Sequence, residues 1–116
     1  MKTILVVDDE PDMVFLLRLT LERAGYQVIE AHHGAAALQR LSDQRPDAVL
    51  TDLMMPVMDG RQLILSIRSN PSMSQIPIGL VSANPDGTTG ADATLKKPYR
   101  PSELLELVRG LLGDGT

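Results

Sequence analysis

Acidic side chains directly follow an apolar run near the start of the chain. Ile4 to Val7 is apolar, and Asp8, Asp9 and Glu10 come next. Two carboxylates a few ångströms apart repel each other by about 1 kcal/mol in water and by about 4 kcal/mol near a protein surface. A folded chain tolerates such a run where the carboxylates are solvated or where a cation lies between them. The run therefore indicates a candidate cation site.

Three further residues with useful chemistry each follow another short apolar run: Asp52, Ser82 and Lys97. Carboxylate oxygens form the kind of hard site that suits Mg²⁺, which uses few carboxylates and keeps water and phosphate oxygens as its other ligands. An ammonium and a hydroxyl beside such an ion would bind a strongly negative group, and a phosphoryl group fits. One of the carboxylates would then be able to act as the nucleophile and form an aspartyl-phosphate.

The elements that must position these residues alternate between strands and helices along the whole chain. This alternation predicts an α/β fold, with a doubly wound parallel sheet and helices on both faces. In such sheets ligands bind beyond the carboxyl ends of the strands, where the residues above are expected. The expected strands and helices, in chain order, are Ile4 to Val7, Met13 to Ala24, Gln27 to Ala31, Ala35 to Leu41, Ala48 to Thr51, Arg61 to Ser69, Ile76 to Val81, Ala93 to Lys96 and Ser102 to Leu112.

Composition limits the class of protein. The 116 residues are 43% hydrophobic and 22% charged, which predicts a single globular domain over residues 1–116. The chain has no cysteine, which excludes disulfides and thiolate metal sites. Its net charge is −4 and its Lys/Arg clusters do not exceed two residues, so we expect no direct nucleic acid binding by this domain. No apolar stretch approaches the roughly 20 residues of a membrane helix, so we expect a cytoplasmic domain with no membrane contact.

The combined motifs resemble the receiver domain of two-component response regulators over essentially the whole chain. The resemblance implies a flavodoxin-like, five-stranded fold and a phosphoryl group accepted on Asp52 from a sensor histidine kinase or a histidine phosphotransfer protein. The motifs that carry it are Val6-Val7-Asp8-Asp9-Glu10, Asp52-Leu53-Met54-Met55-Pro56, Met58-Asp59-Gly60, Ser82-Ala83, Gly90-Ala91-Asp92 and Lys97-Pro98-Tyr99.

The same resemblance implies a Mg²⁺ site. Asp8, Asp9 and Asp52 would hold the ion, with Asp9 as the likelier direct ligand and Asp8 acting through water. The backbone carbonyl of Met54 would be a further ligand. We interpret Glu10 only as a solvated neighbour of the site.

The resemblance also assigns residues to the phosphoryl group. Ser82 would bond a phosphoryl oxygen and Lys97 would pair with the group, while the peptide bond before Pro98 would be cis. Met54 and Asn84 occupy the positions that orient the hydrolytic water in this family. A methionine side chain activates water poorly, so we expect a long-lived aspartyl-phosphate.

Two features depart from the family pattern. The ten residues 83–92 are too few for an ordinary crossover helix, so we expect the fourth helix of the family to be shortened or absent. Thr94 stands where the family usually has an aromatic switch residue, which makes that switch degenerate. We therefore expect a shallow apolar patch near the fifth strand, and output through ordering of the loop from Asn84 to Gly90.

Other functions remain open from the residues alone. A Mg²⁺-dependent phosphohydrolase working through an aspartyl-phosphate commonly uses Asp-x-Asp, but Leu53 and Met54 follow Asp52 here. A pseudo-receiver that only binds partners is disfavoured because the five site residues are present. We expect no enzyme activity beyond self-phosphorylation and slow autodephosphorylation, an unidentified output partner, and a monomer or weak dimer. His32 and His33 are interpreted as surface-loop residues, since no third metal ligand is near them in the sequence.

Overall fold

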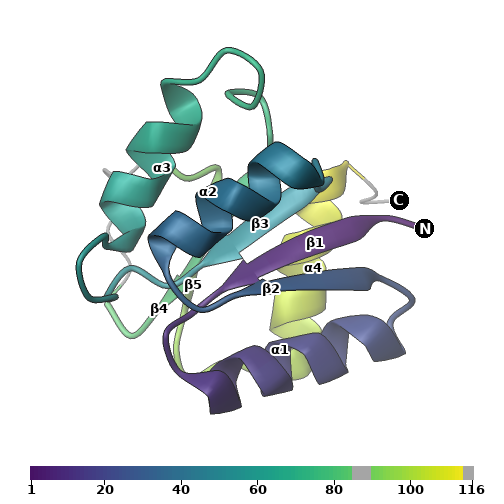
Figure 1. Ribbon diagram of the computed structural model, residues 1–116. Coiled ribbons are helices and arrows are strands. Elements are labelled where there is room, and N and C mark those ends of the chain that lie inside the picture. Colours follow the sequence, from purple (N-terminus) through teal and green to yellow (C-terminus); the bar gives the residue numbers. More distant parts are fainter. Residues whose placement is uncertain (85–89, 114–116) are drawn as a thin grey trace.

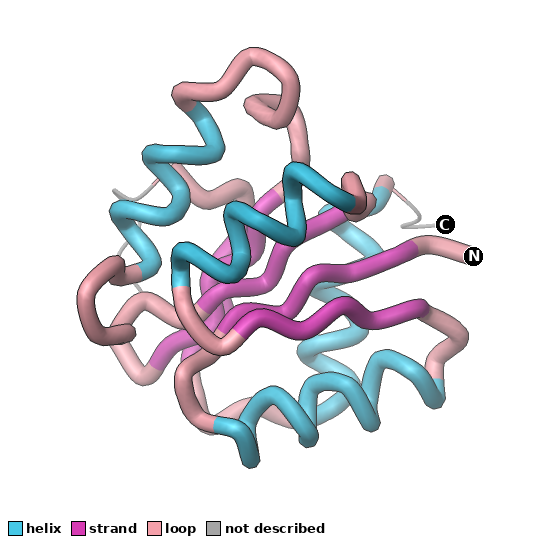
Figure 2. Tube along the Cα trace, in the orientation of Figure 1, coloured by secondary structure: helices cyan, strands magenta, loops and turns pink. Residues whose placement is uncertain are grey.

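The computed structural model describes residues 1–84 and 90–113, and its centre is a five-stranded parallel sheet with the strand order β2-β1-β3-β4-β5 (Figures 1 and 2). Both neighbours of β1 are parallel to it, so the chain winds outward in two directions from the centre of the sheet. The doubly wound fold expected from the sequence is confirmed. The strands are β1 (Thr3–Val7), β2 (Gln27–Ala31), β3 (Ala48–Thr51), β4 (Ile78–Ser82) and β5 (Ala93–Lys96).

The helices of the described residues lie on both faces of the sheet, with α2 and α3 on one side and α1 and α4 on the other (Figure 1). Two element starts differ by two residues from the sequence expectation, and the other starts agree with it to within one residue. Helix α1 begins at Pro11, whose fixed φ suits the first turn of a helix. Strand β4 begins only at Ile78, because the backbone N–H of Ile76 is used in a turn with Met73 and Pro77 has no N–H to donate. The helices are α1 (Pro11–Arg23), α2 (Gly34–Asp43), α3 (Gly60–Arg68) and α4 (Pro101–Leu112).

The hydrophobic core has two parts, one on each face of the sheet. Successive residues of β1 point to opposite faces, so Leu5 and Val7 belong to one part and Ile4 and Val6 to the other. The first part packs against α2 and α3, and the second against α1 and α4. Because both faces of the sheet are covered, its central strands are buried and present only their carboxyl ends to ligands.

The connection between β4 and β5 is where the sequence predicts a shortened or absent helix. Its described residues, 83–84 and 90–92, contain no helix. The loop expected to become ordered, Asn84 to Gly90, lies partly outside the described residues, because 85–89 are not among them.

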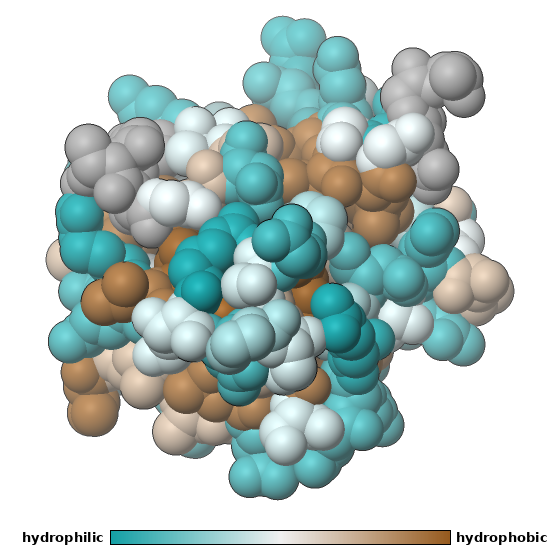
Figure 3. Space-filling model, turned by 90° about the horizontal axis from the view of Figure 1, so that it is seen from above, coloured by the Kyte–Doolittle hydropathy of each residue, from teal (hydrophilic) through white to brown (hydrophobic). Residues whose placement is uncertain are grey.

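β5 itself contributes no large exposed apolar side chain to the patch expected near it, and the loop that would border this patch lies partly outside the described residues, so the patch stays a prediction. Thr94 and Lys96 are the exposed residues of β5, and both are polar, while Ala93 and Leu95, which alternate with them, are half-buried. On the side of the molecule seen in Figure 3, the coloured surface is largely hydrophilic, and its hydrophobic residues occur in separate small groups. The large apolar side chains exposed in the described part of the chain are Met1, Phe15, Leu16, Met54, Val57 and Leu65.

Within the described ranges, no helix has both the length and the apolar character needed to cross a membrane.

Candidate functional site

The carboxyl ends of β1 and β3 bring two aspartates together. Val7 of β1 is paired with Thr51 of β3, so the residues that follow them, Asp8 and Asp52, start from adjacent positions at one edge of the sheet. Asp8 is 1% exposed and Asp52 is 7% exposed. Two buried carboxyl groups side by side need a positive charge nearby.

Lys97 supplies the positive charge that the structure shows. It follows β5, and its Nζ lies 3.2 Å from Asp8 Oδ2 and 3.5 Å from Asp52 Oδ2. Its backbone N–H donates to the Ser82 carbonyl, and the Lys97–Pro98 peptide bond is cis, as the resemblance implies. Burial acts to lower the pKa of Lys97, but the attraction of Asp8 and Asp52 together outweighs burial and raises the pKa. The ammonium is therefore held charged between the two aspartates.

One ammonium does not fully compensate Asp8. Burial raises the pKa of its carboxyl group, and repulsion from Asp52 adds to this. The Glu10 backbone N–H, which donates to Asp8 Oδ1 at 3.0 Å, and Lys97 act in the opposite direction without cancelling the increase in pKa. The site therefore retains an excess of negative charge that a cation would relieve.

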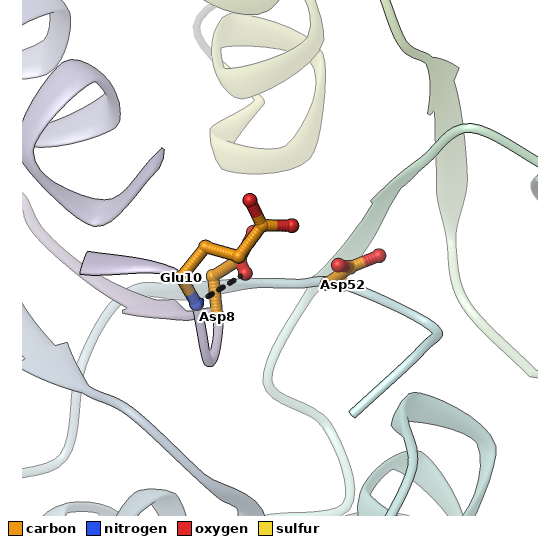
Figure 4. Close-up of side chains that lie close together, drawn as sticks. All are labelled: Asp8, Glu10 and Asp52. Atoms are coloured by element: carbon orange, nitrogen blue, oxygen red, sulfur yellow. Dashed lines mark hydrogen bonds between the residues drawn. The ribbon is translucent and has the colours of Figure 1, made fainter. Parts of the chain in front are cut away.

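Glu10 joins this site, which the sequence interpretation did not foresee. One carboxylate oxygen from each of Asp8, Glu10 and Asp52 lies within 4.8 Å of the others. Figure 4 shows the Asp8 and Glu10 side chains next to each other after β1, with Asp52 beside them at the end of β3. The i, i+2 spacing of Asp8 and Glu10 would have indicated this, since alternate residues of an extended chain share a side. Asp9 is exposed and is not a member of the group.

The backbone around Asp52 is fixed by the loop that leads into α3. Asp52 Oδ1 accepts from the N–H groups of Leu53 at 2.7 Å and Met54 at 3.4 Å. A side chain at Gly60 would collide with the Asp52 carbonyl and would come within 2.8 Å of the Leu53 Cα. Only glycine allows this close approach, so the start of α3 lies directly against the backbone of the acidic site.

Ser82 is the last residue of β4, which neighbours β3 in the sheet. The residue is 1% exposed, and its hydroxyl oxygen accepts from the Asn84 N–H at 3.4 Å. Thr94 lies in β5, paired with Leu80 of β4, and is exposed, so it fills no buried position of the kind an aromatic switch would need. The structure thus places Ser82 on the strand beside that of Asp52 and leaves Thr94 at the surface.

The two histidines are surface residues, as the sequence predicts. His33 caps α2, where its Nδ1 accepts from the Ala36 N–H at 3.1 Å. His32 Nε2 lies 3.9 Å from Glu30 Oε1. Neither belongs to the acidic group at the strand ends.

The donors gathered at this edge suit a hard divalent cation. They are carboxylate oxygens without thiolate or imidazole, a set typical of Mg²⁺ and Ca²⁺ sites. The adjacent ammonium would at the same time favour an anion beside the ion. Buried acids, a fixed ammonium and a hydroxyl at the ends of parallel strands fit the phosphoacceptor and metal site of an α/β domain.

Comparison with known proteins gives the same class. Residues 4–109 match the model of the response regulator receiver domain family, and the chain belongs to that family. Receiver domains take phosphoryl groups from sensor histidine kinases. Receiver domains of response regulators are generally not classic enzymes, which favours the receiver interpretation over the phosphohydrolase alternative.

The chain is similar both to curated proteins and to solved structures. The chain is 36% identical over 118 residues to the alkaline phosphatase synthesis transcriptional regulatory protein PhoP of Bacillus subtilis, covering 96% of this chain and 48% of PhoP. The chain thus spans about half the length of that curated relative. The receiver domain of a signal transduction histidine kinase from Syntrophus aciditrophicus is 32% identical, with a TM-score of 0.92 and coverage of 98% of this chain and 92% of that one.

A third similar protein was solved with Mg²⁺ bound. The response regulator protein TrrA from Thermotoga maritima, solved in complex with Mg²⁺–BeF, is 33% identical with a TM-score of 0.89. The match covers 97% of this chain and 100% of TrrA.

Proposed function

We propose that residues 1–116 form one receiver domain in which Asp52 accepts a phosphoryl group from a phosphohistidine of a sensor kinase or a histidine phosphotransfer protein. The observation that carries this proposal is the shared contact of Lys97 Nζ with Asp8 Oδ2 and Asp52 Oδ2 at the carboxyl edge of the sheet. It holds a carboxylate nucleophile next to the positive charge that an incoming phosphoryl group requires. The proposal includes a cytoplasmic location.

In the transfer, an Asp52 carboxylate oxygen forms the new P–O bond while the P–N bond to the donor histidine breaks. The imidazole leaves with the electron pair of that bond. Lys97 then pairs with a phosphoryl oxygen, and the Ser82 hydroxyl donates to another. Leu53 N–H, which donates to Asp52 Oδ1, holds the carboxylate in one orientation and leaves its other oxygen beside Lys97.

Mg²⁺ fits the donors at this edge, and we propose that Asp8, Asp9, Asp52 and the Met54 carbonyl hold it. When bound, the ion neutralises charge on the phosphoryl oxygens as a Lewis acid. The excess negative charge around Asp8 supports this proposal, as does the Mg²⁺–BeF complex of TrrA. Because the site offers charge but no closed cage, we expect weak binding of the ion.

We propose slow loss of the phosphoryl group as well. Met54, two residues after Asp52, is 71% exposed and has no group able to accept a proton from water. The protein would then act as a switch with a long-lived phosphorylated state and would have no other turnover. The output partner and the choice between monomer and weak dimer stay predictions from the sequence.

Incubation with acetyl phosphate tests this proposal by intact mass. With Mg²⁺ we expect a gain of one phosphoryl group per chain, and with excess EDTA we expect none. After removal of the donor, the phosphorylated mass should persist and decay slowly. Equal labelling with and without the metal would contradict the role of Mg²⁺, and immediate loss of the label would contradict the role of Met54.

A further inference from the structure

We propose that Glu10 is an additional positioning residue of this site, which holds the water shell of the bound Mg²⁺ and raises the affinity of the protein for the ion. The proposal rests on the proposed function, because it adds a residue to the metal site described there. The spacing of the carboxylates and the burial of Asp8 and Asp52 support it.

The position of Glu10 is fixed by its backbone. It is the N-cap residue of α1, and its N–H donates to Asp8 Oδ1 at 3.0 Å. Its carboxylate makes no capping hydrogen bond with the helix and instead lies in the group with Asp8 and Asp52, within 4.8 Å. The Glu10 side chain therefore faces the acidic site, although this brings its carboxylate close to those of Asp8 and Asp52.

Within the described part of the chain, no ion pair neutralises the Glu10 carboxylate. Lys97 Nζ is in contact with the other two carboxylates, and no ion pair of the described residues includes Glu10. An exposed carboxylate with this placement is free to accept hydrogen bonds from water. Mg²⁺ gives up its waters reluctantly, so most of the contacts around a bound ion are made through them.

Residues that hydrogen-bond to the ligands of a metal ion typically change metal affinity by about 10- to 100-fold when removed, and a water on the ion is such a ligand. Glu10 is exposed, so we expect an effect near or below the lower end of that range. Replacing it with glutamine keeps the shape of the side chain and removes only the charge. Glu10→Gln should therefore weaken Mg²⁺ binding by roughly three- to tenfold.

Asp12 offers a matched control. It is also acidic and exposed, and it lies two residues further along in the first turn of α1, but it is not a member of the acidic group. Asp12→Asn removes one charge from the same helix end. A general change in the electrostatic field of the protein would weaken Mg²⁺ binding equally in both variants. A specific role of Glu10 would weaken Mg²⁺ binding only in Glu10→Gln.

The test is a titration of each metal-free protein with MgCl₂, followed by the NMR shifts of backbone amides next to Asp52. We expect the dissociation constant to rise roughly three- to tenfold in Glu10→Gln and less than twofold in Asp12→Asn, relative to the unchanged protein. Similar constants for the two variants, or no change in Glu10→Gln, would overturn the proposal. The amide spectrum of each variant without metal shows that it is folded.

The titration needs no phosphoryl donor, so its result is separate from the test of phosphorylation. If Glu10→Gln binds Mg²⁺ as tightly as the unchanged protein while acetyl phosphate still labels the chain, only the role of Glu10 fails. If the chain binds Mg²⁺ with the expected dependence on Glu10 but is never labelled, the proposed phosphoacceptor function fails instead.

Discussion

The ionised form of the Asp8 carboxyl group is unfavourable in the folded protein. Burial and the neighbouring Asp52 raise the pKa of Asp8, so the ionised form is less favourable in the folded chain than in the unfolded one. A raised pKa of a carboxyl group means that the folded state gains stability at low pH. This gain disappears as the pH rises through the folded-state pKa.

We therefore predict that Asp8→Asn raises the unfolding temperature of the metal-free protein at neutral pH, and that this advantage shrinks as the pH is lowered. Thermal unfolding in EDTA across a pH series measures it. Addition of Mg²⁺ should stabilise the unchanged protein but not the variant, because the variant has lost a carboxylate of the site. Lower stability of Asp8→Asn in EDTA would contradict the description of Asp8 as uncompensated.

Val57 is a second residue held in an unfavourable state, for a different reason. Its φ is 68°, in the left-handed region, where a β-branched side chain meets the backbone. The side chain is fully exposed and contributes no packing that would offset the strain. It lies in the loop between Asp52 and α3, whose path is fixed by the close approach of Gly60 to the Asp52 backbone.

We predict that Val57→Gly raises the free energy of unfolding by about 1 kcal/mol, because glycine adopts this conformation without steric cost. Urea unfolding of the two proteins gives the difference. Val57→Ile is the control, since it keeps the branched Cβ and should change the stability very little. A destabilised Val57→Gly would show that the loop gains more from a restricted unfolded chain than it loses to strain.

At the scale of elements, the end of α3 is bound to the short connection before β5. Arg68 donates to the carbonyls of Ser74 and Ile76 and to that of Gly90, and its Nη2 lies 2.7 Å from Asp92 Oδ2. The same carboxylate oxygen accepts from the Ile78 N–H at the start of β4. One guanidinium thus links α3, the turn before β4 and the entry to β5.

We predict that Arg68→Met lowers the free energy of unfolding by roughly 2 kcal/mol, because several carbonyl groups and Asp92 lose a charged donor. Urea unfolding measures the loss, and hydrogen exchange should show it first at the amides of β5. Arg23→Met, at the exposed end of α1, should change the stability by less than about 0.5 kcal/mol. Equal effects of the two substitutions would mean that the Arg68 contacts contribute nothing specific.

Local signals in the sequence were sufficient for the order of elements and for most of the site. Apolar runs followed by Asp8, Asp52 and Lys97 predict both the sheet and the edge at which these residues meet, because parallel strands end on the same side. The delayed start of β4 was not predicted, since the turn that uses the Ile76 N–H competes with the strand. The apolar patch expected near β5 stays a prediction, although the exposed positions of β5 itself hold the polar residues Thr94 and Lys96.

Other features depend on contacts between distant residues, which a single sequence does not show. Arg68 and Asp92 are 24 positions apart in the sequence, and neither residue has a neighbour that indicates their ion pair. The inclusion of Glu10 in the acidic group depends on where Asp52 lies relative to the end of β1. The positive φ of Val57 follows from the path of the loop, which the packing of Gly60 sets.

At the scale of the whole molecule, the fold brings the carboxyl ends of four strands, β1, β3, β4 and β5, to a single edge, and Asp52 lies at the centre of that edge. It is adjacent to Asp8 through the pairing of β1 with β3 and to Lys97 through space. The chain spans about half the length of the curated relative PhoP.

The measurement that tests the central claim most directly is the intact mass of Asp52→Asn after incubation with acetyl phosphate and Mg²⁺, beside the unchanged protein and Glu22→Gln. The unchanged protein and Glu22→Gln, whose substitution is in the exposed end of α1, should each gain one phosphoryl group. Asp52→Asn should gain none, because asparagine lacks the carboxylate that attacks phosphorus. Stoichiometric labelling of Asp52→Asn would show that another residue accepts the phosphoryl group and would contradict the account.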